Sequence, residues 1–243
     1  RYLVRHKHTS PLEMCDIKLH IKLPIFVMRQ LVRHRTSSLN EYSGRYSLMT
    51  DEFYMPDAQH IKPQSSDNKQ GRAGEFSEQE ALEIQSNIRH ITEEAYDVYQ
   101  SFVGNEEDPG YNLAREIART VLPVSNYTEL YWKQNLHNMF HMLRLRIDSH
   151  AQWEIQEYAR AIYAIIQPLY PIACEAFEDY IKESATFSRM ELNLLKDIVA
   201  TYDGSITGFI GDKMSHDGLS EAEFAKQYGM TKRELTEFTA RFK

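Results

Sequence analysis

One segment of the chain alternates strictly between apolar and polar residues, and this pattern constrains the fold more than any other feature. It spans residues 15–23, with an apolar side chain at every odd position. Because successive side chains of a strand point to opposite faces of a sheet, the pattern predicts a strand with one buried and one exposed face. Residues 127–134, rich in threonine and aromatic side chains, form the second predicted strand.

Helical patterns occupy most of the remaining chain. Residues 77–103 keep apolar side chains at helical spacing, begin with a capping box of Ser77 and Glu80, and end before Gly104. Further helices are predicted at residues 25–33, 112–121, 135–146, 148–167 and 171–184, and three shorter ones lie in the last 55 residues, with capping boxes at Ser220 with Glu223 and at Thr231 with Glu234. Loops are predicted at residues 36–47 and 56–75. Strands that come early and helices that come later predict an α+β fold, with a mixed or antiparallel sheet and a layer of long helices.

Charge is distributed unevenly along the chain. The net charge is −7, yet residues 1–50 hold nine lysines and arginines against three acidic residues, a net charge of +6, whereas the remaining residues carry −13. A basic segment on an acidic protein predicts an anionic ligand, which could be a phosphorylated small molecule, a nucleic acid or an acidic patch on a partner.

Several classes of protein are excluded by what the sequence lacks. It holds neither a Gly-x-Gly-x-x-Gly motif nor a P-loop, which argues against a dinucleotide bound in the Rossmann manner. No apolar stretch of about 18 residues occurs, so we expect no membrane span. The two cysteines, Cys15 and Cys174, are too few for a disulfide scaffold and indicate a reducing, cytoplasmic location.

The densest polar cluster of the chain lies at residues 30–46. Arg33, Arg35 and Arg45 suit phosphate oxygens, because a guanidinium presents a planar fork of donors. Ser43 and Gly44 offer a hydroxyl and a close backbone approach, which together with an arginine make an anion pocket. Glu41 among these arginines should stay ionised and accept a hydrogen bond from a ribose hydroxyl or a base N–H.

The string R-H-R-x-x-S-x-N-E-x-S-x-R-Y, at residues 33–46, resembles the signature of the flavin-dependent thymidylate synthases, with all nine fixed positions filled. The stretches at residues 8–13 and 135–154 resemble the same family. The resemblance covers about residues 1–182. It implies a catalytic α+β domain at residues 1–184, whose family counterpart has a further N-terminal part, followed by a helical C-terminal extension at residues 185–243.

The resemblance also implies an activity. The family makes dTMP from dUMP, with methylenetetrahydrofolate as carbon donor and NADPH as reductant through FAD. Its members are homotetramers with active sites shared between subunits, and we therefore expect dUMP, folate, NADPH and further copies of the chain as partners, with neither a membrane nor a nucleic acid among them.

Site residues are carried over from the family position by position. The dUMP-binding residues implied in this way are Gln30, Arg33, Glu41, Ser43, Gly44, Arg45, Arg119 and Arg146. Of these, Arg146 would face the uracil ring as a catalytic group, and Ser43 is a second catalytic candidate that is expected to bind phosphate first. The FAD- or folate-binding residues implied are His8, Ser10, Glu13, Arg33, His34, Arg35, Asn135, His137, His141 and His150.

Two other functions stay open at this point. His137 and His141 stand four residues apart on one predicted helix, a spacing that can chelate zinc, although no third ligand is obvious and the main interpretation needs no metal. Ala225, Gly229 and Leu235 have the spacing of a helix-turn-helix, which would indicate DNA binding, although the charges around them are balanced. We expect both cysteines to pack rather than react.

Overall fold

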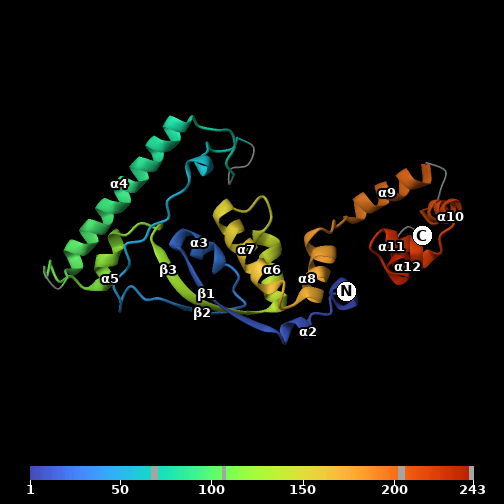
Figure 1. The fold of residues 1–243 in the computed structure, drawn as a ribbon, viewed down its shortest axis with the longest axis horizontal. Helices are drawn as coiled ribbons and strands as arrows, with labels where there is room; N and C mark the ends of the chain where they lie inside the picture. The colour runs from blue at the N-terminus through green and yellow to red at the C-terminus, as the bar shows by residue number, and fades with distance from the viewer. Residues whose placement is uncertain (67–70, 106–107, 202–205, 241–243) are drawn as a thin grey trace. The chain divides into compact units, whose positions relative to one another are not determined.

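The computed structural model describes the chain from Arg1 to Ala240 except residues 67–70, 106–107 and 202–205. The chain divides into two compact units, Arg1–Ser184 and Ala185–Lys243 (Figure 1). None of the described helices is both long enough and apolar enough to cross a membrane.

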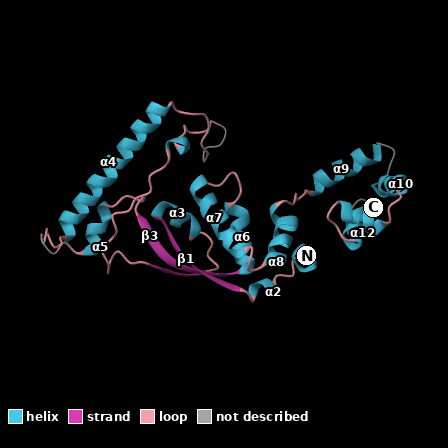
Figure 2. Cartoon of the chain, viewed as in Figure 1, coloured by secondary structure: helices cyan, strands magenta, loops and turns pink. Residues whose placement is uncertain are grey.

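A three-stranded antiparallel sheet organises the first unit. It contains β1 (Asp16–Pro24), β2 (Ser38–Glu41) and β3 (Tyr127–Asn135), in the order β1-β3-β2, shown in magenta in Figure 2. The alternation predicted for β1 is confirmed, because Ile17 and Ile21 are buried whereas Lys18 and His20, which lie between them, are exposed. The second predicted strand is confirmed as β3, which lies between β1 and β2 and pairs with both. Its Trp132, for example, is opposite Leu19 of β1 and Leu39 of β2.

Helices and single turns account for most of the rest of this unit. In chain order they are α1 (Tyr2–Arg5), α2 (Ser10–Glu13), α3 (Ile25–Leu31), the 3₁₀ turn η1 (Ala58–His60), α4 (Glu78–Val103), α5 (Arg115–Ala118), the 3₁₀ turn η2 (Arg119–Val121), α6 (Leu136–Arg146), α7 (Trp153–Ile166), α8 (Pro171–Phe177) and the π-helical η3 (Glu178–Lys182).

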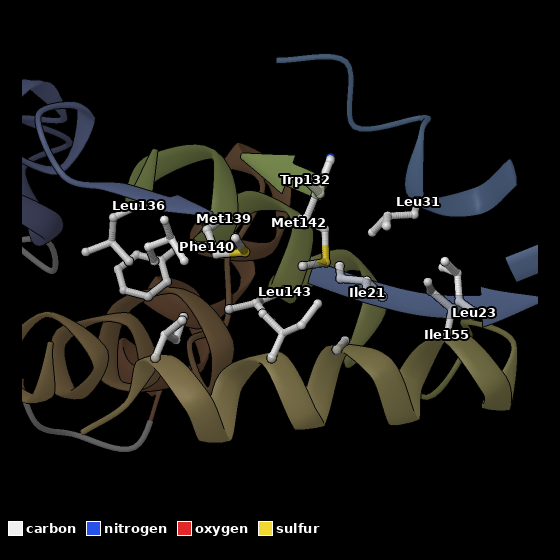
Figure 3. Packing of buried hydrophobic residues seen from close by; sticks show 14 of the residues in the cluster. Ile21, Leu23, Leu31, Trp132, Leu136, Met139, Phe140, Met142, Leu143 and Ile155 are labelled. Carbon is white, nitrogen blue, oxygen red and sulfur yellow. The ribbon is translucent and has the colours of Figure 1, made fainter. Parts of the chain in front are cut away.

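The core lies between the sheet and helices α6 and α7. Figure 3 shows Trp132 of β3, Met142 and Leu143 of α6 and Ile155 of α7 in this cluster of packed side chains, and all four are at most 1% exposed. Burial of each such side chain stabilises the fold by roughly 1.5–3 kcal/mol. Because Asn135 accepts a hydrogen bond from the Asn138 backbone N–H at 2.9 Å, α6 begins directly where β3 ends.

Helix α4 forms as predicted, but only one narrow face of it is buried against the rest of the first unit. Its capping box is present, and Gly104 ends it with a φ of 70°, a conformation that favours glycine. Tyr99 is fully buried and accepts a hydrogen bond from the backbone N–H of Met49 at 3.0 Å. On other faces of the helix, Leu82, Ile91 and Val98 are 49%, 59% and 37% exposed.

Four predicted boundaries were wrong. The loop predicted at residues 36–47 contains β2, a short and largely polar strand whose pairing with β3 decides its structure. The helix predicted at residues 112–121 is reduced to α5 and η2. The helix predicted from residue 148 begins at Trp153, because the Asp148 side chain binds the backbone N–H of His150 instead of capping a helix. The helix predicted at residues 171–184 ends at Phe177 and continues as the π-helical η3.

The second unit contains α9 (Arg189–Thr201), α10 (Ile206–Asp217), α11 (Glu221–Gln227) and α12 (Lys232–Ala240), one helix more than predicted. Both predicted capping boxes are present, at the starts of α11 and α12. Its small core contains Ile210, Phe224, Ala225 and Leu235.

A buried ion pair attaches the segment before α4 to α7. Glu154, only 5% exposed, accepts two hydrogen bonds from Arg72 at 2.8 and 2.9 Å and one from the Tyr54 hydroxyl at 3.0 Å. Burial alone would raise the pKa of Glu154, but hydrogen bonds from its own backbone N–H, Arg72 and Tyr54 lower the pKa on balance. The folded protein thus gains stability from the ionised carboxylate, and this gain is lost as the pH falls through the lowered pKa.

Replacing Arg72 with alanine should destabilise the first unit by about 2–3 kcal/mol, because Glu154 would stay buried without its cation. Denaturant unfolding measures the effect. Lys133→Ala is the matched control, since Lys133 pairs with Asp16 at 2.8 Å on the surface and its loss should cost about 1 kcal/mol or less. Equal losses for the two variants would contradict the assignment.

Candidate functional site

Three helices bring one group of predicted site residues together. The Arg146 side chain, at the end of α6, donates from Nε to Nε2 of His34 at 3.0 Å and from a terminal nitrogen to the carbonyl of Gln30 at 3.3 Å. The Gln30 side chain, on α3, donates to the Gln152 side chain at 2.6 Å, directly before α7. The site therefore sits where the ends of α3 and α6 meet the start of α7.

His34 is held neutral in this group. It is 8% exposed, and burial, the charge of Arg146 and the nearby His141 together lower its pKa to about 4. The His141 ring lies edge-on to the His34 ring, with their centroids 6.1 Å apart. A neutral His34 can accept the hydrogen bond from Arg146 at Nε2, which requires its proton to be on Nδ1.

Arg146 is a half-buried cation with neutral partners. Both its hydrogen-bond acceptors, an imidazole nitrogen and a carbonyl oxygen, are uncharged, and no carboxylate among the described residues pairs with it. Burial lowers the pKa of this guanidinium, because the charge has lost part of its hydration. Such a cation is suited to a ligand that brings electronegative oxygens.

A second group of predicted residues gathers after β2. Gly44 is buried, and a Cβ atom there would lie 2.8 Å from Met49 Sδ and 3.3 Å from Arg119 Cδ, so the Arg119 side chain passes directly over the glycine. The backbone N–H of Arg45 donates to Ser43 Oγ at 3.3 Å. The structure thus brings Ser43, Gly44, Arg45 and Arg119 together.

The guanidinium of Arg45 is available to a ligand. It pairs with Glu116 at 3.2 Å, but both side chains are 54% exposed, and exposed pairs contribute little stability. At the end of β2, Glu41 accepts a hydrogen bond from Thr128 Oγ1 at 2.9 Å. Arg33 and Arg35, which flank the buried His34, are both exposed.

The residues carried over for FAD or folate lie mainly near the start of α6 and at the N-terminus. Ser10 and Glu13 bound α2, which packs against α6. Asn135 uses its side-chain oxygen to cap α6, and His137 follows two residues later in the first turn, half-buried. His8 is exposed and stacks on Tyr2 with ring centroids 6.1 Å apart, while His150 is exposed and bound to Asp148 at 2.7 Å.

Sequence reasoning did not assign a role to Gln152, Arg72 or Glu154. Gln152 and Glu154 lie in the stretch at residues 135–154 that resembles the family, which was the available signal. Together with Arg72 they line an open cavity of about 450 Å³ between η1, α3 and α7. Gln152 therefore belongs both to this cavity and, through Gln30, to the group around Arg146.

The structure does not support the metal alternative. Within the described ranges, no three histidine, cysteine, aspartate or glutamate side chains gather as metal ligands. His137 is half-buried and His141 is exposed beside His34, so the two histidines lie in different surroundings.

The DNA-binding alternative is not supported either. The turn expected for a helix-turn-helix is present, since Ala225 is buried and Gly229 has a φ of 68°. However, the two cations that begin α12 are both paired, Lys232 with Glu221 at 2.8 Å and Arg233 with Glu237 at 2.9 Å. Paired cations leave little positive charge to bind phosphates.

Comparison with known proteins decides the family. The family model described as thymidylate synthase complementing protein matches residues 1–172. This chain belongs to that family. A flavin-dependent thymidylate synthase of Rickettsia bellii is 44% identical over 98% of this chain and 77% of the relative, and one of Thermus thermophilus is 48% identical over 82% of this chain and 69% of the relative. The alignment with the Rickettsia bellii relative therefore includes most of the second unit.

Two solved structures share the fold of this chain. The crystal structure of a UMP/dUMP methylase PolB from Streptomyces cacaoi bound with 5-Br UMP has a TM-score of 0.68 and 33% identity, and covers 74% of this chain and 80% of that chain. The structure of the same methylase with 5-Br dUMP has a TM-score of 0.66. The small antiparallel sheet with its helical layers is therefore a fold shared with these methylases.

Replacing His34 with glutamine should make the protein less sensitive to acid. The folded-state pKa of His34, about 4, lies below the ordinary 6.5, so the unfolded chain takes up the proton first as the pH falls. Wild-type stability should therefore decrease as the pH drops from 6.5 toward 4, and this part of the decrease should be absent from the variant.

Urea unfolding at a series of pH values measures the difference. His216→Gln is the matched control, because the His216 side chain is 88% exposed and its variant should follow the wild type. If His34→Gln also followed the wild type, His34 would not be the neutral buried group described here.

Proposed function

We propose that this chain is a flavin-dependent thymidylate synthase, which converts dUMP to dTMP by reductive methylation. The observation that carries the proposal is the half-buried Arg146, which two neutral acceptors hold and which no described carboxylate neutralises. A guanidinium in this state suits the oxygens of a uracil ring. Membership of the family, and the names of its relatives, support the same function.

The nucleotide phosphate is proposed to bind the second group. Arg119 over Gly44, together with the Ser43 hydroxyl and Arg45, offers two guanidinium groups, a hydroxyl and a close approach to the backbone. Arg33 is proposed to bind the same phosphate. In this arrangement, phosphate would replace Glu116 as the partner of Arg45, because an exposed ion pair contributes little stability and can be exchanged.

Bond formation at uracil C5 requires electron density to move toward that carbon. We propose that Arg146 stabilises the negative charge that develops on the ring oxygens, because a fixed cation in a partly dry site acts strongly on developing charge. Gln30 and Glu41 would orient the nucleotide through hydrogen bonds. Ser43 Oγ accepts from a backbone N–H and lies beside no identified base, so its proposed role is phosphate binding first and catalysis second.

The donor set also fits a flavin. Exposed or half-buried arginine, histidine and serine side chains around α2, His34 and the start of α6 suit the pyrophosphate of FAD. The residues proposed to hold FAD or folate are His8, Ser10, Glu13, Arg33, Arg35, Asn135, His137, His141 and His150, whereas His34, which the resemblance also places at the flavin, is buried against Arg146. The flavin supplies hydride transfer when bound, and the protein supplies placement. NADPH and methylenetetrahydrofolate are the proposed co-substrates.

We further propose a homotetramer with shared active sites. The Arg146 group lies on α3, α6 and α7, whereas the Arg119 group lies beside α4 and α5 (Figure 1), so a second copy could bring one group to the other. Leu82, Ile91 and Val98 leave apolar side chains of α4 exposed, as expected of a helix that packs against another copy.

The proposed location is the cytoplasm, because both described cysteines are free. Residues 1–184 are the proposed catalytic domain, and residues 185–243 are a proposed helical extension.

The proposed function is tested by the absorbance spectrum of the purified protein. We expect the absorbance of a bound flavin, a change in that absorbance when dUMP is added, and formation of dTMP when methylenetetrahydrofolate and NADPH are supplied. A colourless protein that binds no added FAD would overturn the proposal.

Replacing Arg33 with alanine should weaken dUMP binding by about 2–4 kcal/mol while the fold survives, because the nucleotide phosphate would lose a charged hydrogen-bond donor. Titration of the flavin spectrum with dUMP measures the affinity. Arg29→Ala, which removes an exposed arginine from α3, is the matched control and should bind dUMP like the wild type. Unchanged affinity in Arg33→Ala would remove Arg33 from the phosphate site.

Replacing both cysteines with serine should leave turnover within roughly tenfold of the wild type. Burial raises the pKa of the Cys174 thiol to about 11, and Cys15 contacts the Pro11 carbonyl at 3.6 Å, so neither is set up as a thiolate nucleophile. The measurement is dTMP formation by the folded, flavin-loaded double variant. Complete loss of activity in that protein would show that a cysteine takes part in catalysis.

A further inference from the structure

We propose that His34 is a positioning residue, which acts on the reaction by fixing the guanidinium of Arg146 through an Nε–H···Nε2 hydrogen bond. The inference rests on the proposed function and goes beyond it, because the family resemblance places His34 at the flavin rather than behind Arg146. The structure instead shows a ring that is 8% exposed and directed at Arg146 Nε at 3.0 Å.

The geometry of the hydrogen bonds makes the arrangement specific. A guanidinium is planar, so fixing Nε and one terminal nitrogen fixes the whole plane. His34 binds Nε and the Gln30 carbonyl binds one terminal nitrogen, and the remaining N–H groups stay directed away from these two contacts. The orientation of the free donors is therefore set from behind by His34.

The backbone around His34 holds its ring in place. The His34 N–H donates to the Leu31 carbonyl at 3.1 Å, and its own carbonyl accepts from Ser37 Oγ at 3.1 Å. The ring of His141 meets it edge-on from α6. These contacts fix the ring on the short turn that follows α3, so that it faces the last turn of α6.

A neutral acceptor has a chemical advantage over a carboxylate at this position. A glutamate or aspartate would hold Arg146 equally well, but it would also neutralise the charge that is needed at the uracil ring. An imidazole nitrogen orients the guanidinium and leaves its positive charge uncompensated. Positioning without neutralisation is thus the function assigned to His34.

The test compares two substitutions at His34 in the full-length, flavin-loaded protein. His34→Gln places a neutral acceptor near the position of Nε2, whereas His34→Leu removes the acceptor. We expect His34→Leu to lower kcat for dTMP formation at least tenfold, with the KM for dUMP changed by less than threefold. His34→Gln should retain kcat within about threefold of the wild type. His216→Leu, at an exposed histidine of the second unit, is the control and should not change kcat.

A double-mutant cycle with Arg146→Gln separates positioning from other roles. If His34 acts through Arg146, His34→Leu should cost no further activity, within twofold, once Arg146 is replaced. An equal loss in both backgrounds would overturn the proposal. Loss of bound flavin in His34→Leu that persists with Arg146→Gln would also overturn it, because His34 would then act on the flavin directly.

A spectroscopic measurement tests the hydrogen bond whatever the protein binds. In protein labelled with ¹⁵N-histidine, the His34 signals, assigned by their absence from His34→Gln, should show the proton on Nδ1 and an accepting Nε2. Arg146→Gln should shift these signals. A proton on Nε2 in the wild type would overturn this inference, while wild-type protein without dUMP-dependent turnover would overturn the proposed function and leave this result standing.

Discussion

The pairing of β1 with β3 is the constraint on which the site depends. Each strand continues directly into a helix, β1 into α3 and β3 into α6, and the two strands run antiparallel from Asp16 opposite Asn135 to Pro24 opposite Tyr127. The two helices therefore begin at opposite ends of the pair. Helix α6, about 16 Å long, runs back along the sheet, so that its last residue, Arg146, reaches the end of α3.

Burial of one sheet face fixes this arrangement energetically. The side chains of Trp132, Met142 and Leu143 hold α6 against the strands, and a one-residue slip of β1 against β3 would turn its apolar side chains toward solvent. Polar groups within the site add little to stability in comparison. A half-buried guanidinium without a carboxylate partner loses hydration energy. A bound ligand with negatively charged or electronegative oxygens would replace that lost hydration.

The sequence predicted the elements whose signals are local. The alternation of β1, the aromatic strand β3 and the α4 capping box each follow from residues near one another, and each is confirmed. The strand β2 was missed because four largely polar residues carry no clear pattern, and their structure comes from pairing with β3. The contacts of the site could not be predicted in this way, since Arg146 and His34 lie 112 positions apart and Gln30 and Gln152 lie 122 apart.

We propose that Arg146 faces the uracil ring of a nucleotide whose phosphate is held by Arg33, Arg45 and Arg119. A crystal of the flavin-loaded protein with 5-bromo-dUMP tests it most directly, because the anomalous signal of bromine marks C5 of the ring. The account predicts a bromine peak beside the ring that Arg146 contacts, with Arg33, Arg45 and Arg119 around the phosphate, from one copy of the chain or from two. A nucleotide bound in the crystal away from Arg146 in every copy would contradict it.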